Sequence, residues 1–360
     1  MLRRYGNALI FAASTLRGVA MRGIVFLGER ELELREFPDP TPGPREVVVE
    51  IKASGMCGSD LPPYRAGRES MRPIIRGHEP CGVVAARGSG VTEEEAPIGQ
   101  RVMIHHYSGC GQCKYCRVGY AQLCVKGGHL VYGANANGGH GDYILVKPYM
   151  LVPLPEELSF EEGASISCGT GTAFDALRRL DVSGRDTLAV YGQGPVGLSA
   201  TLLAKAMGAR VIAVDVGPER LALAREFGAD EALDAKQVDP VAAVKDLTHG
   251  EGATTTLDCT GQPEARVNAV KSACMWGRAC FVGEGNTVTL DVSPDVIHKQ
   301  LTIYGSWTFS SVGQAQCARF IVDHGIDLER LLTNRFSLDQ AKEAYKLFDT
   351  QTTGKGVFVR

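Results

Sequence analysis

Four cysteines lie close together in one short stretch of the sequence, with the spacing C-x2-C-x2-C-x7-C. Thiolates bind zinc strongly, and four of them complete a tetrahedral shell that leaves no position for a substrate. The pattern therefore predicts a structural zinc site, and Gly109 and Gly111 suit the tight turns of such a loop. An iron–sulfur cluster is the alternative, since the first three cysteines also have a spacing that occurs around such clusters. The four residues are Cys110, Cys113, Cys116 and Cys124.

A second group of possible metal ligands is dispersed along the chain. Cys57 follows the end of an expected strand, and His78 and Cys168 each lie in a glycine-rich segment. Two thiolates and one imidazole, with a fourth position open, make a catalytic zinc site. Each residue alone is more often a core residue than a ligand, however. Spacing does not join the three.

A glycine-rich turn stands between two apolar strands, expected at residues 187–191 and 210–215, and opens a helix expected at 195–207. This order is the context of the dinucleotide fingerprint G-x-G-x-x-G. The first glycine permits the tight turn, the second admits the pyrophosphate, and the third lets the helix approach the strand. Asp215 ends the second strand, where a carboxylate binds ribose hydroxyls and favours NAD over NADP. The turn comprises Gly192, Gly194, Pro195, Val196 and Gly197.

The elements that position these residues are of two kinds. The first part of the chain reads as short strands, at 22–27, 32–35, 46–53, 83–86 and 101–105, which fit a partly open β-barrel. From residue 187 strands alternate with helices, which indicates a doubly wound parallel sheet and an α/β fold. The later expected elements are helix 263–274, strands 279–283 and 301–305, helices 311–325 and 338–348, and strand 357–359.

The composition limits the possible partners. A chain of 360 residues with 44% hydrophobic and 22% charged residues is long enough for two domains. A net charge of −3 does not indicate nucleic acid or an anionic membrane as a partner. Eleven cysteines, several of them predicted ligands, favour a reducing compartment, so we expect a cytoplasmic protein. Residues 1–20 carry three arginines and no acid, and we expect a loose extension or leader before a fold that starts at Met21.

Taken together, these motifs resemble those of the zinc-dependent medium-chain alcohol dehydrogenases, over about residues 21–360. The matching segments occur in the family's order and are Gly55–Asp60, Gly77–Glu79, the four-cysteine loop, Cys168–Thr172 and Gly192–Gly197. The resemblance implies a GroES-like barrel at 21–172 and 309–360, with a Rossmann domain at 173–308 between its parts. It also implies NAD, two zinc ions per chain, an alcohol or carbonyl substrate, and a homodimer or homotetramer.

The resemblance implies roles for individual residues as well. Cys57, His78 and Cys168 would hold the catalytic zinc, which Glu79 can approach in some members. Asp60 would orient His78, and Ser59 would contact the substrate oxygen and pass on its proton. The cofactor contacts implied beside the glycine turn and Asp215 are Thr172, Arg220 and Lys355.

Two positions depart from the family's pattern. Gly58 replaces a histidine or arginine that contacts the pyrophosphate in many members, and Pro62 replaces a histidine that ends the proton relay. The expected reaction is NAD-dependent oxidation of a primary or secondary alcohol to an aldehyde or ketone. A polyol or threonine-type dehydrogenase is the alternative, although Cys168 disfavours it because those relatives often have glutamate there. A non-enzymatic NAD-binding protein is disfavoured because all three ligands are present.

Overall fold

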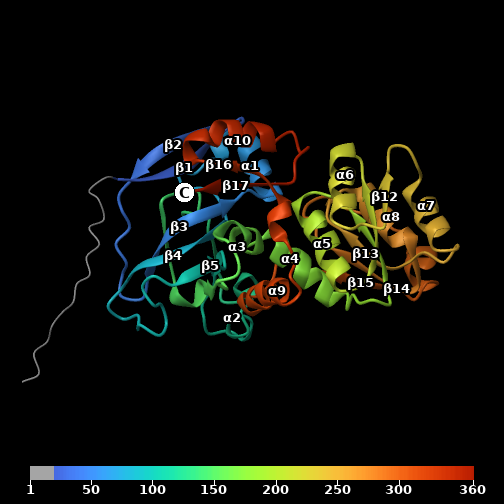
Figure 1. The fold of residues 1–360 in the computed structure, drawn as a ribbon, viewed down its shortest axis with the longest axis horizontal. Helices are drawn as coiled ribbons and strands as arrows, with labels where there is room; N and C mark the ends of the chain where they lie inside the picture. The colour runs from blue at the N-terminus through green and yellow to red at the C-terminus, as the bar shows by residue number, and fades with distance from the viewer. Residues whose placement is uncertain (1–19) are drawn as a thin grey trace, which may run out of the picture.

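Two large β-sheets organise residues 20–360, the part of the chain that this computed structural model describes. Each sheet forms the centre of one lobe, and helices α3, α4, α5 and α9 lie between the lobes (Figure 1). The expected extension falls almost entirely outside the described residues. The α/β prediction of a partly open barrel beside a doubly wound parallel sheet is confirmed.

The second lobe contains a six-stranded parallel sheet with the order β12-β11-β10-β13-β14-β15. The central strands are apolar and buried on both faces, because helices cover both sides of the sheet. The strands are β10 (Thr187–Tyr191), β11 (Arg210–Asp215), β12 (Glu231–Asp234), β13 (Ala253–Asp258), β14 (Ala273–Phe281) and β15 (Thr302–Gly305). The helices are α5 (Pro195–Ala206), α6 (Pro218–Glu226), α7 (Pro240–Leu247) and α8 (Pro263–Ser272), with a π-helical turn at Ser293–Ile297.

The first lobe contains a mostly antiparallel sheet with the order β16-β17-β3-β4-β5-β9, and β8 also pairs with β3. A hairpin, β1 with β2, and a small ladder, β6 with β7, complete it. The strands are β1 (Met21–Gly28), β2 (Glu31–Phe37), β3 (Val47–Gly55), β4 (Glu79–Arg87), β5 (Arg101–Ile104), β6 (Tyr107–Ser108), β7 (Leu130–Val131), β8 (Tyr143–Val146), β9 (Leu151–Pro153), β16 (Leu332–Phe336) and β17 (Lys355–Val359).

The remaining helices join the lobes or cover the barrel. The largest hydrophobic core runs from Ala53 and Cys81 in the barrel to Leu188 and Val190 in the parallel sheet. It passes through α3 and α4, so the two lobes share one apolar interior. The helices are α1 (Leu61–Arg65), α2 (Lys114–Arg117), α3 (Phe160–Ile166), α4 (Gly169–Arg179), α9 (Ser311–Asp323) and α10 (Ala341–Phe348), and the 3-10 turn η1 spans Gly58–Asp60.

Two expectations for the elements were wrong. The helix expected at 263–274 ends at Ser272, and the strand expected from residue 279 begins at Ala273. Pairing of Ala273 with Ala253 draws this residue into the sheet before the main part of the strand. Strand β16 was not expected, because its sequence LTNRF lacks a clear apolar alternation. The domain boundaries at 172/173 and 308/309 stay a prediction. None of the helices within residues 20–360 has the length and hydropathy of a membrane span.

Candidate active site

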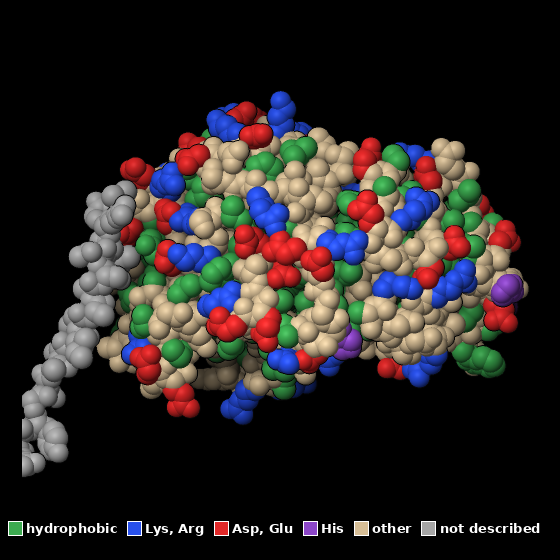
Figure 2. Space-filling view, in the orientation of Figure 1, with side chains coloured by type: hydrophobic (Ala, Val, Ile, Leu, Met, Phe, Trp, Pro, Cys, Tyr) green, Lys and Arg blue, Asp and Glu red, His purple; other side chains and the backbone are tan. Residues whose placement is uncertain are grey.

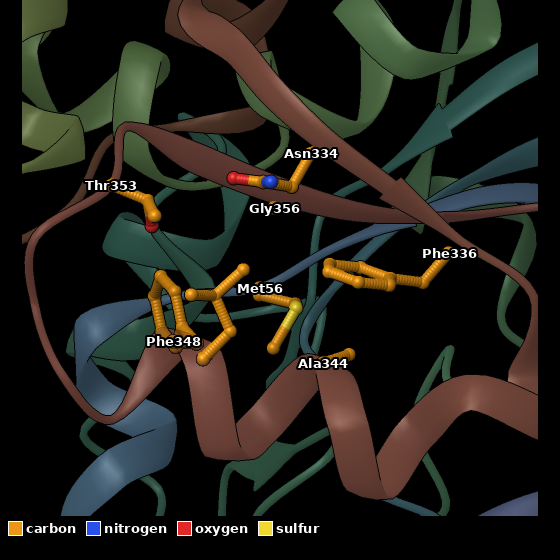
Figure 3. Close-up of a pocket in the computed structure, with 8 residues that line it drawn as sticks. Met56, Asn334, Phe336, Ala344, Phe348, Thr353 and Gly356 are labelled. Carbon is orange, nitrogen blue, oxygen red and sulfur yellow. The ribbon is translucent and has the colours of Figure 1, made fainter.

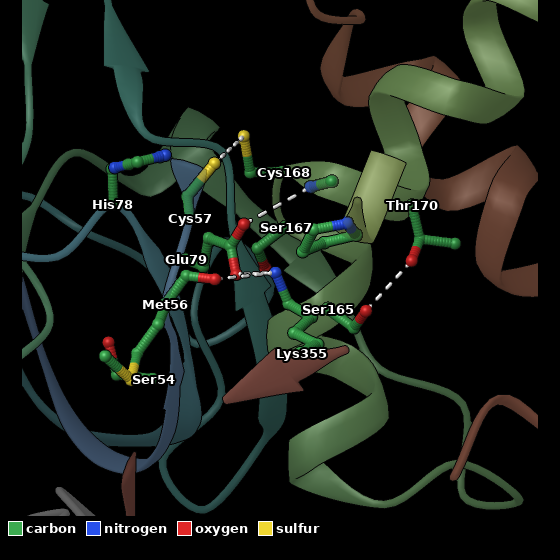
Figure 4. A network of polar contacts seen from close by, with 12 residues as sticks. Ser54, Met56, Cys57, His78, Glu79, Ser165, Ser167, Cys168, Thr170 and Lys355 are labelled. Atoms are coloured by element: carbon green, nitrogen blue, oxygen red, sulfur yellow. Dashed lines mark hydrogen bonds and ion pairs between the residues drawn. The ribbon is translucent and has the colours of Figure 1, made fainter. Parts of the chain in front are cut away.

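Four possible ligands that are far apart in the sequence meet where the lobes join. Ligand atoms of Cys57, His78, Glu79 and Cys168 all lie within 4.8 Å of one another, and all four residues are buried. Cys57 follows β3, His78 and Glu79 stand at the start of β4, and Cys168 caps α4. The Sγ atoms of Cys57 and Cys168 are 4.0 Å apart (Figure 4). The fold thus joins residues that spacing alone could not.

Asp60 and Ser59 contact this cluster from η1. The Asp60 carboxylate lies 3.1 Å from His78 Nδ1, which leaves Nε2 facing the other ligands. Ser59 Oγ lies 3.2 Å from that Nε2 and 3.3 Å from Cys57 Sγ. The Cys168 hydrogen bond and the nearby His78 lower the pKa of the Cys57 thiol well below its usual value. A thiolate is therefore favoured at Cys57, as a metal ligand requires.

Glu79 and Lys355 form an ion pair beside the ligand cluster, and both side chains are fully buried. Gly169 N donates to Glu79 Oε1 at 3.3 Å, and Lys355 Nζ donates to the Met56 carbonyl at 3.2 Å (Figure 4). Burial raises the pKa of Glu79, and the paired Lys355 ammonium opposes the shift and favours the ionised carboxylate. The structure accounts for the Lys355 charge through Glu79, so its predicted contact with a pyrophosphate stays a prediction.

The side chains of the four-cysteine loop also converge on one point, as the ligands of a tetrahedral metal site must. One ligand atom from each cysteine lies within 4.8 Å of the others, and Cys113 and Cys116 Sγ are 3.5 Å apart. Backbone N–H groups of Gln112 and Cys113 donate to Cys110 Sγ. The structure explains why the two positions that the sequence singled out are glycine. Gly111 has φ +70°, and a Cβ at Gly109 would lie 2.6 Å from Cys116 Sγ.

The glycine turn has the geometry expected from its sequence. Gly192 has φ +90°, which an L side chain rarely adopts. A Cβ at Gly197 would lie 1.7 Å from the Gly192 carbonyl oxygen, so only glycine allows α5 this close to the turn. A Cβ at Gly194 would meet no atom nearer than Arg220 Nη2 at 3.9 Å. Open space at Gly194 is what a phosphate group approaching the α5 N-terminus requires. Pro195 and Val196 form the first turn of α5.

Asp215 and Arg220 lie beside this turn. Asp215 is buried, and its carboxylate accepts from the backbone N–H groups of Gln193 at 2.5 Å and Gly217 at 2.8 Å. Arg220 approaches both Gly194 and Gly217, and its buried Nε has no partner among the described residues. Thr172, in the first turn of α4, likewise has a buried hydroxyl without a described partner. Both groups are hydrogen-bond donors that a polar ligand can satisfy.

The two departures from the expected pattern leave room at the site. A Cβ at Gly58 would meet nothing within 4 Å, so no neighbouring side chain fills the position of the expected basic residue. Pro62 lies inside the short helix α1, and its side chain has no group that can take part in a proton relay. Ser59 itself is exposed, so its hydroxyl has a direct route to solvent.

His106, which none of the sequence motifs contains, lies against the ligand cluster. Its ring centroid is 5.1 Å from that of His78, and its Nδ1 lies 3.1 Å from the Ser167 carbonyl oxygen. Burial lowers the pKa of His106 well below its usual value and keeps the ring neutral. Only its position just before the four-cysteine loop could have marked it, because the approach to His78 depends on the fold.

A separate pocket lies between α10 and strands β16 and β17 (Figure 3). Met56, Phe336 and Phe348 make its lining largely apolar, and none of the predicted site residues lines it. It is therefore not the candidate active site.

Comparison with known proteins agrees with this geometry. Residues 43–156 match the family model of the alcohol dehydrogenase GroES-like domain, and residues 195–322 match that of zinc-binding dehydrogenases. The uncharacterised zinc-type alcohol dehydrogenase-like protein YphC of Escherichia coli K12 is 41% identical, over 92% of this chain and 96% of its own. Sorbitol dehydrogenase of Bacillus subtilis is 30% identical, over 90% and 92%. A structure described as a short chain alcohol dehydrogenase (rspB) of E. coli CFT073, solved with NADH, has 27% identity and a TM-score of 0.86 over 95% of this chain and all of its own.

Proposed function

Because the chain belongs to the zinc-binding alcohol dehydrogenase family, we propose that it oxidises a primary or secondary alcohol with NAD. The observation that carries this proposal is the buried convergence of Cys57, His78 and Cys168 on one point. Helix α4, which begins after Cys168, links this point to the helix that follows the glycine turn, since Thr170 Oγ1 of α4 lies 3.0 Å from Ser199 Oγ of α5. A metal centre and a dinucleotide turn on two bonded helices suit hydride transfer between an alcohol and a nicotinamide.

The ligand set fits zinc at both positions. Cys57, His78 and Cys168 would hold the catalytic ion, with the Glu79 carboxylate close enough to approach it. The four thiols of the cysteine loop would hold a structural ion. Two buried thiols and a neutral imidazole nitrogen match the donor set of catalytic zinc, and four cysteines match structural zinc.

Two buried donor groups without a described partner fit NAD. Thr172 and Arg220 would donate to it, and the open space over Gly194 would admit its pyrophosphate. Asp215 would bind ribose hydroxyls and repel a 2′-phosphate. Lys355 is proposed as a further contact of NAD because its side chain is basic.

The residues of the chain then have distinct tasks in the reaction. When bound, zinc supplies Lewis-acid polarisation of the substrate oxygen and NAD supplies the hydride acceptor. Asp60 accepts a hydrogen bond from the Nδ1–H group of His78, and this bond keeps Nε2 free as a ligand atom. Ser59 Oγ lies 3.3 Å from Cys57 Sγ and the residue is exposed, so its hydroxyl would take up the substrate proton while it passes its own proton to water. Pro62 takes no part, which shortens the relay to this one hydroxyl.

A polyol is the second candidate substrate, and His106 is the observation that favours it. A neutral imidazole beside the ligand cluster offers a hydrogen bond to a second hydroxyl of the substrate. One relative, the sorbitol dehydrogenase of Bacillus subtilis, is named for a polyol substrate. Cys168 remains the argument for a simple alcohol.

The decisive experiment follows NADH absorbance with purified protein, over a panel of alcohols, vicinal diols and polyols, with NAD and NADP in parallel. We expect turnover with NAD and two zinc ions per chain. A Cys57→Ala variant that oxidises alcohol as fast as wild type would contradict the proposal. Turnover confined to polyols, and reduced by His106→Phe, would select the second candidate.

We also propose that the protein forms a cytoplasmic homodimer or homotetramer. Strand β15 is the edge of the parallel sheet, and Ile303 on it is 38% exposed. Met275 and Trp276, on the neighbouring β14, are 62% and 74% exposed. An apolar sheet edge favours pairing with a second copy. Light scattering of wild type and Trp276→Glu tests the assembly, and equal masses would contradict this interface.

Elsewhere, acidic and basic side chains alternate over the visible face, without a large basic patch for nucleic acid (Figure 2).

A further inference from the structure

We propose that Tyr345 and His140 are positioning residues that act on His78 through Asp60. The proposal rests on the proposed function, since it concerns the zinc that His78 would hold. Tyr345 lies on the C-terminal helix α10, and His140 lies in the loop before β8. Neither residue touches the ligand cluster, and nothing in the sequence links them to it.

An unbroken series of hydrogen bonds joins the four side chains. His140 Nε2 lies 2.8 Å from the Tyr345 hydroxyl oxygen, which in turn lies 3.3 Å from Asp60 Oδ2. The other carboxylate oxygen, Oδ1, is the atom 3.1 Å from His78 Nδ1. At the far end, Ser54 Oγ lies 2.7 Å from His140 Nδ1.

The direction of every hydrogen bond in this series is fixed. Asp60 has only acceptor atoms when ionised, so the Tyr345 hydroxyl donates to it. The Tyr345 oxygen must then accept from His140, which places the His140 proton on Nε2 and leaves Nδ1 to accept from Ser54. Burial lowers the pKa of His140 to about 4, and a neutral ring carries one proton as this arrangement requires. The series thus holds Asp60 in one orientation, as an acceptor of the His78 Nδ1 proton.

Burial makes the series difficult to replace by water. Ser54, Asp60, His140 and Tyr345 are between 0% and 5% exposed. A Cβ at Gly77, which has φ +86°, would lie 2.3 Å from His140 Nδ1. The glycine before His78 therefore allows the His140 ring to lie against the loop that carries the ligand. Removing one hydroxyl leaves buried groups unpaired, and Asp60 loses part of what orients it.

The test is the rate at which each zinc leaves the protein. Wild type, Tyr345→Phe and Tyr64→Phe are mixed with a chromogenic chelator, and zinc release is followed over time. The control is matched, because the Tyr64 ring lies 5.3 Å from the Tyr345 ring in the same cluster and has no described bond to Asp60. The ion of the four-cysteine loop serves as an internal reference in each sample.

We expect Tyr345→Phe to release one of its two zinc ions roughly tenfold faster than wild type, since residues that orient zinc ligands typically change affinity about 10–100-fold. The second ion and the Tyr64→Phe protein should match wild type. Equal release from Tyr345→Phe and wild type, or equal acceleration of both ions, would overturn the inference. If Tyr345→Phe does not fold, Ser54→Ala replaces it, with a smaller acceleration expected and no acceleration refuting it. A wild type with only one zinc would instead refute the proposed function.

Discussion

The glycines of the nucleotide turn offer a test that separates folding from cofactor binding. Gly194 and Gly197 belong to one fingerprint, and each is replaced by alanine in turn. The structure gives them different reasons to be glycine. A Cβ at Gly197 would lie 1.7 Å from the Gly192 carbonyl oxygen, whereas a Cβ at Gly194 would find only Arg220 Nη2, at 3.9 Å.

The expected magnitudes follow from these distances. Ordinary contact begins at 3.4 Å, so Gly197→Ala must move α5 or the turn by about 1.7 Å. Such overpacking costs about 1–3 kcal/mol of the unfolding free energy. Gly194 has φ −73° and ψ −173°, which alanine adopts without strain, so Gly194→Ala should change stability by less than about 0.5 kcal/mol. Its methyl group would occupy the space proposed for the pyrophosphate, and we expect NADH affinity to fall at least about tenfold, which is about 1.4 kcal/mol.

The assay combines two measurements on protein without cofactor. Urea unfolding gives the stability, and calorimetric titration with NADH gives the affinity. Gly184→Ala serves as the control, because its Cβ would make only an ordinary contact of 3.6 Å. The reasoning is refuted if Gly194→Ala binds NADH as tightly as wild type. It is equally refuted if Gly197→Ala is as stable as wild type.

Three further predictions address the metal, the cofactor and pH. Cys57→Ala should abolish alcohol-dependent NADH formation and lower the zinc content from two ions to one by elemental analysis, because the other ion has its own four ligands. Asp215→Asn can keep one oxygen as acceptor for the Gln193 N–H, gives up the second acceptor that faces Gly217, and removes the charge, so the kcat/KM ratio of NADP to NAD should rise roughly tenfold, or about 1.4 kcal/mol. Burial, with His78 and Lys355 adding to it and Asp60 opposing, lowers the pKa of His140 to about 4. The unfolded chain, with a histidine pKa of about 6.5, then binds more protons below pH 6.5, so His140 should withdraw about 2 kcal/mol of stability between pH 7 and pH 5.

Each of these has a result that would contradict it. Loss of both ions in Cys57→Ala would mean that the two sites are not independent. An unchanged cofactor ratio in Asp215→Asn would remove the carboxylate from cofactor selection. The difference between the urea midpoints of His140→Gln and wild type should change as pH falls, because the variant loses less stability, and parallel curves would show that His140 does not report this titration.

Much of the fold could be predicted because local signals agreed with tertiary structure. The strand at 187–191 and that at 210–215 have the same bounds in the structure, since continuous apolar runs must be buried on both faces. Local signals failed where pairing decided the outcome. Ala273 belongs to a strand through its partner Ala253, and β16 is a strand because β17 lies beside it.

The candidate site divides in the same way. The four-cysteine loop and the glycine turn are contiguous, so their spacing carries their geometry. Cys57, His78 and Cys168 came together only through family resemblance, because β3, β4 and α4 must first assemble. Spacing carried no trace of Tyr345, which reaches Asp60 from a helix 285 positions later in the chain.

The late position of Tyr345 in the sequence affects how the site forms. The chain supplies the ligands from its first half, but it supplies Lys355 beside Glu79 and Tyr345 beside Asp60 from its last strand and helix. A buried carboxylate without such partners is unfavourable to ionise. Asp60 already has His78 and the Cys57 N–H as partners, and Glu79 has the Gly169 N–H. They gain the Tyr345 hydroxyl and the Lys355 ammonium only once α10 and β17 have joined the barrel. We infer that a zinc site of full affinity requires the C-terminal segment, even though that segment contributes no ligand.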